Sequence, residues 1–292
     1  MSTAIIINPI SGGASPAAAR ARAQLALAVI DAHGDPVEVL MTERVGHARE
    51  LAKSAVRRGA RLVLAWGGDG TINEVASALA FDEVPLGIVP AGSGNGLARE
   101  LGVHLRPERA IADALQAVPR PMDLGEIDGR LFANIAGIGF DAYVASQFAT
   151  ARRRGFLGYA GITARALTGY VPLTYRITSG GVQREARAIL VTIANSAQFG
   201  NNARIAPGAL VDDGLLDLVV VEERSRMRTL VQLPRLFNGT AARIPGCTIR
   251  KVREVTIEAD QPMTYHVDGE PVSGGTKLRA RIHPGALMIS VR

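Results

Sequence analysis

The stretch RLVLAWGGDGTINEV, residues 61–75, contains an apolar run, a glycine-rich turn and the start of a helical pattern. Residues 61–66 are rich in Leu and Val and have the length of a buried strand, and Gly67, Gly68 and Gly70 follow within four positions. Glycine at such a junction lets the backbone turn sharply from a strand into a helix. The stretch therefore predicts a strand, a tight loop and a helix in succession.

The same alternation continues on both sides of this stretch. Further apolar strands are predicted at residues 4–8, 37–41 and 85–90. Helical segments lie between them, one at residues 46–58 and another opening where Pro16 follows Ser15. Short apolar strands that alternate with helices indicate β-α-β units and a parallel sheet.

The pattern changes after about residue 124. The later apolar runs are short, rich in β-branched residues and separated by turn residues, which predicts a mostly antiparallel β domain. These runs are residues 173–178, 188–194, 215–221, 255–258, 263–267 and 277–282. Helical insertions are predicted at residues 141–167 and 227–237. The sequence thus predicts an α/β domain at residues 1–124 and a β domain at residues 125–292, with an extreme C-terminus able to pack back on the first domain.

Three of the predicted strands end in a glycine-bearing loop that opens a helix. The loops are residues 8–13, 67–71 and 91–95. The carboxyl ends of parallel strands lie along one edge of the sheet, where the ligands of open α/β folds bind. Glycine allows close approach to a ligand, and the free N–H groups at a helix start attract anions. The loops predict a polyanionic ligand such as a nucleotide; three purely structural turns are the alternative.

Neither common nucleotide-binding motif is present. The motif G-x-x-x-x-G-K-[ST] is absent, and G-x-G-x-x-G fails in the third loop because Leu97 stands at its third glycine position. The chain has three lysines, none near the loops in sequence: Lys53, Lys251 and Lys277. Phosphates are therefore expected to be held by backbone N–H groups, arginine, metal and the hydroxyls of Ser11, Thr71 and Ser93.

Asp69 lies between two glycines at the predicted start of a helix. Aspartate is a common N-cap, so helix capping is one interpretation. A carboxylate in a phosphate loop would repel the phosphates unless a cation or a proton transfer makes use of it. The surrounding glycines and Thr71 favour this second, functional interpretation.

Composition limits the class of protein. The chain has 292 residues, of which 47% are hydrophobic, enough for two modest domains. The single cysteine excludes an internal disulfide and fits a reducing, cytosolic compartment. The net charge is +6 but only 4% of residues are aromatic, which argues against nucleic-acid binding. No signal peptide and no apolar run near the roughly 20 residues of a membrane span is visible, so a soluble cytoplasmic protein is expected.

Six motifs resemble the diacylglycerol kinase catalytic-domain family, which includes sphingosine and ceramide kinases and bacterial lipid kinases. In family order they are NPISGG at 8–13, TER at 42–44 with GHA at 46–48, GGDGTINEV at 67–75, PAGSGNGLAREL at 90–101, DDGLLD at 212–217 and DGE at 268–270. GGDGT alone also occurs in NAD kinases and resembles a phosphofructokinase motif, whereas PAGSGN together with DGE is more specific. Gly96 departs from the Asp of diacylglycerol-type members and is closer to sphingosine kinases.

The resemblance implies a nucleotide-binding domain of the NAD-kinase and phosphofructokinase type over a β-sandwich, with the active site in the cleft between them. It implies ATP binding by the positions that match the family's loops. These are Asn8, Pro9, Ser11, Gly12, Thr42, Gly67, Gly68, Asp69, Gly70, Thr71, Asn73, Gly92, Ser93 and Asn95. It further implies that Glu270 is the general base for the lipid hydroxyl. A structural Mg²⁺ would be bound by the Asp213 carboxylate and the backbone carbonyls of Leu210 and Leu215.

The carboxylates of the C-terminal motifs also have simpler interpretations. Asp268 and Glu270 would lie on one side of an extended strand by its two-residue period and could position Mg–ATP and take a proton. An exposed hairpin turn is the alternative. The acidic residues at 212–217 could equally form a solvated turn. Asp141 is a candidate lipid contact, with a helix N-cap as the alternative.

The sequence therefore predicts transfer of the γ-phosphate of Mg–ATP to a hydroxyl of a diacylglycerol or sphingoid-type lipid. A kinase of a soluble substrate, such as an NAD kinase, and a nucleotide-binding sensor without catalysis are the alternatives. Eight basic residues and no acidic one between residues 224 and 253 predict peripheral association with the inner membrane surface, a solvated face being the alternative. They are Arg224, Arg226, Arg228, Arg235, Arg243, Arg250, Lys251 and Arg253. A homodimer is compatible with the sequence.

Overall fold

The computed structural model of the chain describes residues 2–13, 15–150, 169–200, 203–224, 232, 235 and 239–292. They form two compact units. The first unit comprises Met1–Met122 and Gly285–Arg292, and the second unit comprises Asp123–Pro284. Most of the two predicted helical insertions, together with Arg226 and Arg228, lies outside the described residues.

The first unit contains a parallel sheet in the order β4-β3-β1-β2. Its strands are β1 (Ser2–Ile7), β2 (Val37–Met41), β3 (Ala60–Gly67) and β4 (Leu86–Pro90). Nearly every residue of β1, β3 and β4 is buried, as expected of a parallel sheet covered on both faces. The predicted parallel α/β fold is therefore confirmed.

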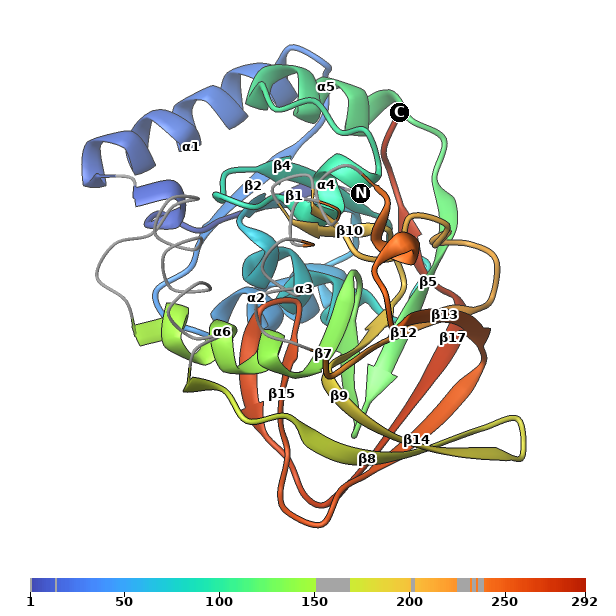
Figure 1. Cartoon of the computed structure of the whole chain (residues 1–292). Coiled ribbons are helices and arrows are strands. Elements are labelled where there is room, and N and C mark those ends of the chain that lie inside the picture. The colour runs from blue at the N-terminus through green and yellow to red at the C-terminus, as the bar shows by residue number, and fades with distance from the viewer. Residues whose placement is uncertain are drawn as a thin grey trace. The chain divides into compact units, whose positions relative to one another are not determined.

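Helices cover both faces of this sheet. Figure 1 shows α1 and α5 on one face and α2 and α3 on the other. The helices of the unit are α1 (Pro16–Asp31), α2 (His47–Arg57), α3 (Asp69–Leu79), α4 (Gly96–Glu100) and α5 (Pro107–Gln116). The Ser15 hydroxyl accepts a hydrogen bond from the Ala18 N–H at 3.3 Å, and Pro16 occupies the first helical position, as predicted. The contacts of α1 and α5 with the sheet bury a core that includes Ile5, Leu64 and Trp66.

The last residues of the chain complete the first unit. Strand β17 (Lys277–Ile289) reaches it with its C-terminal end, where Ile289 pairs with Leu86 of β4 in parallel. The Ser290 N–H donates to the Leu86 carbonyl at 2.8 Å, and the Ser290 hydroxyl donates to the Ala114 carbonyl of α5 at 2.7 Å. The chain therefore returns to its N-terminal unit at the end.

The second unit is built from antiparallel pairs, which confirms the predicted β domain. Its elements are β5 (Arg120–Ile127, which starts in the first unit), β6 (Arg130–Phe132), β7 (Ile135–Gly139), α6 (Phe140–Thr150), β8 (Leu173–Ser179), β9 (Val182–Ala194), β10 (Gln198–Gly200), β11 (Ala203–Arg204), β12 (Leu216–Glu222), β13 (Cys247–Val252), β14 (Glu254–Glu258), β15 (Thr264–Val267), β16 (Glu270–Ser273) and most of β17.

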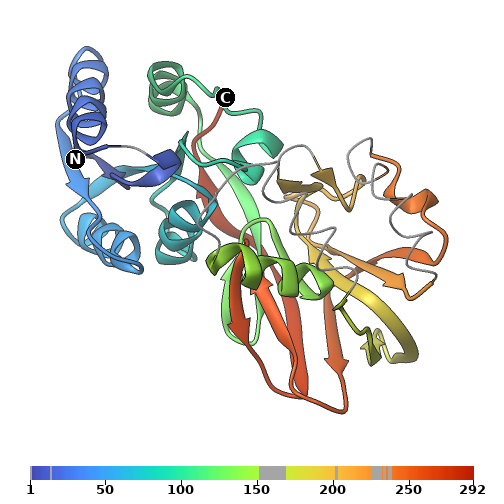
Figure 2. The ribbon, with the colours of Figure 1, turned by 60° about the vertical axis from the view of Figure 1, so that its left-hand side comes forward.

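The long strand β9 organises the second unit, and Figure 2 shows it as a yellow arrow. Its first half pairs with β8, its second half pairs with β7, and β12 also pairs with the second half. Tyr175, Ile193, Leu218 and Leu278 belong to one buried cluster of this unit. A second cluster lies where Ile205 and neighbouring apolar residues pack against β12. The strand pairings thus create two cores that hold the loops of this unit in place.

Candidate functional site

The three predicted glycine loops follow adjacent strands of the first unit. They come after β1, β3 and β4, which are neighbours in the order β4-β3-β1. The loops touch one another: a Cβ added at Gly92 would lie 2.7 Å from the Gly68 Cα, and one added at Gly12 would lie 2.6 Å from the Ala91 carbonyl oxygen. Only glycine permits such an approach at Gly92 and Gly12. The structure therefore brings the three loops together at the carboxyl edge of the sheet.

Asn8 connects the first loop with the second. Its side-chain amide donates to the Thr71 hydroxyl at 2.9 Å, and its Oδ1 accepts the Ile10 N–H at 3.1 Å. The backbone N–H of Asn8 donates to the Trp66 carbonyl at 2.9 Å. Asn8 thus fixes the first loop against the end of β3 and the start of α3, and Ser11 folds back to donate to the Asn8 carbonyl at 2.9 Å.

Asp69 connects the second loop with the third. It is the first residue of α3, and Gly68 rather than Asp69 is the N-cap, so the interpretation of Asp69 as a helix cap is wrong. Its Oδ1 accepts the Gly96 N–H at 2.8 Å, at the start of α4. Asn95 stabilises the same loop from within, because its Oδ1 accepts the Gly92 N–H at 2.8 Å. The carboxylate of Asp69 therefore lies where the second and third loops meet, and a functional role there stays a prediction.

Arg22 is a loop-supporting residue that the sequence did not reveal. Its guanidinium donates to the Asn8 carbonyl at 3.1 Å, to the Ser11 hydroxyl at 2.8 Å and to the Ser11 carbonyl at 3.0 Å. It also lies over the Trp66 ring at 5.9 Å from the centroid, a cation–π geometry. Partial burial lowers the pKa of Arg22, although an arginine stays charged. One positive charge is thus fixed beside the first loop.

The remaining nucleotide candidates lie around these loops. Thr42 is buried and its N–H donates to the Ile7 carbonyl at 3.0 Å, next to the first loop. Asn73 lies on α3 and its Oδ1 accepts the Ser77 hydroxyl at 3.4 Å, whereas Ser93 is exposed in the third loop. Glu74, which the sequence reasoning did not single out, accepts the N–H groups of Gly46 at 2.7 Å and of Ala48 at 3.0 Å. Glu74 therefore holds the start of α2 against α3.

In the second unit, Asp268 and Gly269 form the two-residue turn between β15 and β16. Both have positive φ, 47° and 90°, the conformation of a type I′ hairpin turn. The expectation that Asp268 and Glu270 share one extended strand is therefore wrong, because the turn separates them. The carboxylate of Asp268 accepts three backbone N–H groups at 2.8–3.0 Å, from Ala133, Asn134 and Ile135.

These bonds make Asp268 an anchor that ties the hairpin turn to the segment before β7. Glu270 begins β16, where it pairs with Val267, and its side chain is exposed. Of the two predicted carboxylates, Glu270 therefore has the accessibility that a general base requires. Its catalytic role stays a prediction.

Asp141 lies inside the second unit, at the start of α6. Its Oδ2 accepts the Thr192 hydroxyl at 3.1 Å and lies 3.5 Å from His266 Nε2, and both ionisable side chains are almost fully buried. His266 Nδ1 accepts the N–H of Gly269, at 3.3 Å, from the hairpin turn. Gly137 leaves the space for this group, since a Cβ there would collide with Asp141 and His266. Asp141 thus supports the hairpin that carries Glu270, and lipid contact by Asp141 stays a prediction.

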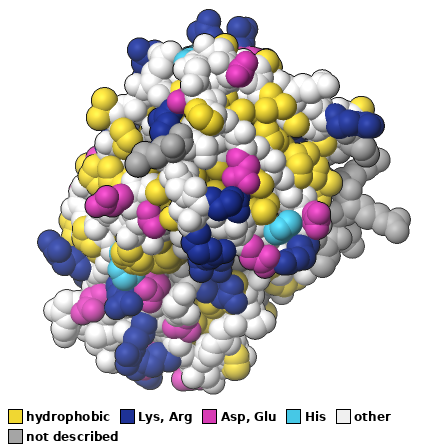
Figure 3. All heavy atoms as spheres, turned by 180° about the vertical axis from the view of Figure 1, so that it is seen from behind, with side chains coloured by type: hydrophobic (Ala, Val, Ile, Leu, Met, Phe, Trp, Pro, Cys, Tyr) yellow, Lys and Arg dark blue, Asp and Glu magenta, His cyan; other side chains and the backbone are white. Residues whose placement is uncertain are grey.

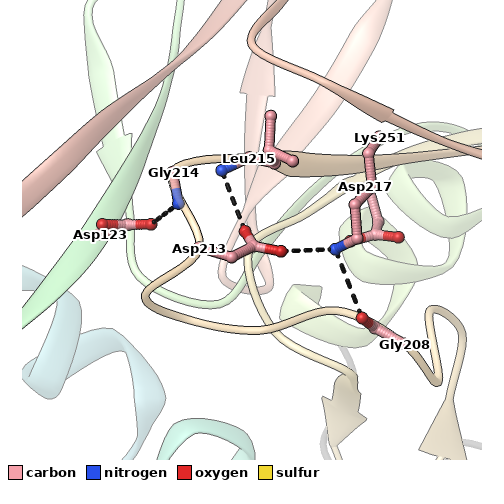
Figure 4. A network of polar contacts seen from close by, with 7 residues as sticks. All are labelled: Asp123, Gly208, Asp213, Gly214, Leu215, Asp217 and Lys251. Carbon is pink, nitrogen blue, oxygen red and sulfur yellow. Dashed lines mark hydrogen bonds and ion pairs between the residues drawn. The ribbon is translucent and has the colours of Figure 1, made fainter.

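The predicted magnesium site at Asp213 does not fit the residues around it. Asp213 Oδ1 accepts the Leu215 N–H at 3.0 Å, and Oδ2 accepts a hydrogen bond from Lys251 Nζ at 2.7 Å (Figure 4). The ammonium of Lys251 therefore stands beside the oxygen that a metal would need and would repel a divalent ion. Among the described residues no group of three or more His, Cys, Asp or Glu side chains could hold a metal ion.

Comparisons with known proteins assign the chain to a class of kinases. Residues 2–127 match the diacylglycerol kinase catalytic domain, and residues 134–291, more than half of the chain, match the YegS C-terminal NAD kinase beta sandwich-like domain. Proteins named "Probable lipid kinase YegS-like" from Pseudomonas aeruginosa strain PAO1 and Pseudomonas fluorescens strain Pf-5 are 35% and 32% identical. They match over 263 and 264 residues, 88% of this chain and 85% and 86% of theirs.

Solved structures agree on the fold. A crystal structure of a diacylglycerol kinase from Bacillus anthracis str. Sterne has a TM-score of 0.76 at 20% identity, covering 100% of this chain and 97% of that chain. A second crystal structure from the same organism has a TM-score of 0.83 at 24% identity with the same coverage. The chain belongs to the diacylglycerol kinase catalytic-domain family, in the two-domain form with a YegS-type C-terminal domain.

Proposed function

We propose that this kinase-family protein transfers the γ-phosphate of Mg–ATP to a hydroxyl group of a lipid. The observation that carries the proposal is the mutual contact of three glycine loops at the carboxyl edge of the parallel sheet. Loops of this kind offer several backbone N–H groups and helix starts to phosphates, so no lysine of the P-loop type is needed. The names of the relatives, which describe lipid kinases, support a lipid as the acceptor.

The loop residues would share the work of holding the nucleotide. The backbone from Asn8 to Gly12 and from Gly67 to Thr71 would bind phosphate oxygens, and Arg22 adds a fixed positive charge beside them. Bound Mg²⁺ would neutralise the negative charge of the phosphates. Asp69 could hold such an ion, because its carboxylate lies where the second and third loops meet and Mg²⁺ prefers oxygen ligands.

Glu270 would act on the acceptor. Its carboxylate would take the proton of the lipid hydroxyl while that oxygen attacks the γ-phosphorus. The bond from the γ-phosphorus to the bridging oxygen breaks, and ADP leaves with the electron pair. Asp268, with its oxygens bonded to backbone N–H groups, would keep the hairpin in place without taking part in the proton transfer.

The acceptor would be met at a membrane surface. None of the helices in the described part of the chain is long and apolar enough to cross a membrane. Among the described residues of the 224–253 stretch, four arginines are exposed: Arg224, Arg243, Arg250 and Arg253. We extend the proposal to peripheral association of these arginines with the anionic inner surface of the cytoplasmic membrane. The face drawn in Figure 3 offers a mixed surface, because its Lys and Arg side chains stand among Asp and Glu side chains.

The deciding experiment is transfer of labelled phosphate from ATP to a panel of acceptors in mixed micelles. The panel contains diacylglycerol, monoacylglycerol, a sphingoid base, ceramide and, as the soluble competitor, NAD. Transfer of the label to a lipid, lost when Glu270 is replaced by Gln, supports the proposal. Labelling of NAD alone would assign the chain to a soluble substrate, and binding of ATP with no labelled acceptor would indicate a nucleotide sensor.

A further inference from the structure

One lysine contacts both the loop that leads into β12 of the second unit and β12 itself. Lys251, on β13, donates from Nζ to Asp213 at 2.7 Å, to Asp217 at 3.0 Å and to the Gly208 carbonyl at 3.4 Å (Figure 4). Gly208 and Asp213 lie in the loop between β11 and β12, and Asp217 lies on β12 itself. Three oxygens therefore converge on one ammonium group.

The positive charge of Lys251 lies next to the buried carboxylate of Asp217. The Asp217 side chain is 5% exposed, whereas those of Asp213 and Lys251 are 20% and 39% exposed. A buried carboxylate without a cation is strongly unfavourable. Burial raises the pKa of Asp217, and the hydrogen bond from Lys251 acts in the opposite direction. The positive charge of Lys251 thus offsets the buried charge of Asp217, beside the loop.

The loop also has a packing role that depends on its position. Its residues Ile205, Ala206 and Ala209 are buried in a cluster with Val219 of β12. Asp123 fixes the same loop from the other side: its Oδ2 accepts the Gly214 N–H at 2.7 Å, and its own N–H donates to the Val211 carbonyl at 2.7 Å. Lys251 and Asp123 are therefore two polar attachments of one loop to the strands around it.

We infer that the ammonium of Lys251 is the structural cation of this loop, in place of the divalent ion that the family resemblance predicted there. An ammonium carried by β13 is part of the fold, so the loop does not depend on the concentration of free metal. Mg²⁺ requires nearly octahedral oxygen ligands at about 2.0–2.1 Å. The Asp213 oxygens are already directed at the Leu215 N–H and at Lys251. The chain has only three lysines among 33 basic residues, which makes a lysine here a specific feature.

The single cysteine supplies a local readout. Cys247 lies on β13, the strand of Lys251, and pairs with Val221 of β12. Burial raises the pKa of the Cys247 thiol to about 11, so it reacts slowly while the strand is in place. Cys247 is half-buried, and opening of the β12 and β13 pair would expose it further. A change in its labelling rate by a thiol reagent therefore reports a change in the stability of this region.

The first arm uses the wild-type protein without nucleotide or lipid, so its outcome is independent of the proposed kinase activity. The labelling rate of Cys247 is measured with excess EDTA and with millimolar Mg²⁺. We expect the two rates to agree within about twofold, because no metal is needed. Chelation that accelerates labelling tenfold or so, with recovery on adding Mg²⁺, would overturn the inference.

The second arm uses Lys251→Met, which keeps most of the apolar stem and removes the charge. We expect labelling to be about tenfold faster or more, because a buried carboxylate loses its cation. Adding Asp217→Asn to this variant should recover part of the loss, since both charges are then absent. Lys277→Met is the matched control: Lys277 pairs with Glu258 at 2.9 Å at the surface, and its loss should leave the rate near that of the wild type.

If Cys247 is labelled at the wild-type rate in the Lys251→Met variant, the inference is also overturned. If that variant does not fold, the comparison of EDTA with Mg²⁺ on the wild-type protein still decides the question.

Discussion

Glu270 has an exposed side chain at the start of β16, directly after the hairpin turn. We predict that Glu270→Gln lowers kcat about 10²–10⁴-fold and leaves the affinity for ATP nearly unchanged, because the amide keeps the size but cannot accept the proton. Single-turnover transfer of labelled phosphate measures the effect. A rate within about threefold of wild type would exclude Glu270 as the base.

Asp268→Asn, two residues earlier, is expected to act on folding instead. The carboxylate of Asp268 accepts three backbone N–H groups, and an amide cannot replace all of these bonds because its nitrogen is a donor. We predict a loss of roughly 1.5–3 kcal/mol in the free energy of unfolding, the range for bonds to a charged group. Chemical denaturation measures this, and an unchanged midpoint with a large loss of kcat would assign Asp268 to the chemistry.

Two substitutions of Asp69 distinguish the effect of its charge from the effect of its hydrogen bond with the Gly96 N–H. We predict that Asp69→Asn keeps the bond from the Gly96 N–H and the stability of the loops but impairs the use of Mg–ATP, because a neutral amide attracts a cation much less than a carboxylate does. Asp69→Ala should impair both. Titration with ATP in the presence and absence of Mg²⁺ measures the difference. Normal turnover by Asp69→Asn would leave Asp69 with a structural role alone.

For single residues, the sequence indicates some of the side chains that make important contacts, but it does not indicate their partners. Local spacing identified Asp69 and Asp268, but their partners are the Gly96 N–H, 27 residues away, and the segment before β7, up to 135 residues away. Arg22 contacts residues 11 and 14 positions away, Lys251 contacts residues 34 to 43 positions away, and neither carries a local signal. Such roles depend on tertiary packing, which a period of two or 3.6 residues does not encode.

At the scale of elements, the contact between glycine loops is the feature most sensitive to change. We predict that Gly92→Ala weakens ATP binding about tenfold or more, because its Cβ would lie 2.7 Å from the Gly68 Cα and displace the N–H groups that are proposed to bind the phosphates. Overpacking of this kind also lowers stability by about 1–3 kcal/mol. The fluorescence of Trp66, the single tryptophan, can follow ATP binding because Gly67 follows it.

Gly275→Ala is the control for this prediction. It adds the same methyl group in the second unit, where the nearest atom beyond the neighbouring residues is the Lys277 nitrogen at 4.0 Å. Its ATP affinity should match that of the wild type. Equal affinities for Gly92→Ala and Gly275→Ala would mean that the loops do not bind the nucleotide.

The hydrophobic pattern of the sequence predicted those strands in which nearly all residues are buried. The strands of the first unit are buried on both faces, so their apolar runs stand out in the sequence. Strand β7 was not predicted because two of its five residues are glycine, and β13 was not predicted because it carries exposed charges. Both strands exist because their neighbours pair with them, β9 and β15 with β7 and β12 with β13.

For the whole molecule, we predict that vesicle binding rises with the content of anionic lipid and falls as salt is added. The arginines of the 224–253 stretch would supply roughly 1 kcal/mol each near an anionic surface, within a Debye length of about 8 Å at physiological salt. Co-sedimentation with vesicles of graded phosphatidylglycerol content measures binding. Arg250→Glu with Arg253→Glu should weaken it and raise KM for lipid but not for ATP.

The control for this prediction is Arg106→Glu with Arg109→Glu. It changes two exposed arginines of the first unit and produces the same change in net charge. Vesicle binding that is equal for neutral and anionic lipids, or equally weakened by the two double variants, would leave the 224–253 stretch as an ordinary solvated face.

The pairing of Ile289 with Leu86 makes the first unit discontinuous along the chain. A ribosome synthesises residues 285–292 only after the whole second unit, so β4 lacks this neighbour, and the Ala114 carbonyl lacks the Ser290 hydroxyl, until those residues have emerged. The second unit is one uninterrupted segment, Asp123–Pro284, and can fold before then. Domains generally fold from the N-terminus onward during synthesis. In this chain the nascent first unit is instead completed only by residues 285–292, and it is exposed to chaperones and proteases in the meantime.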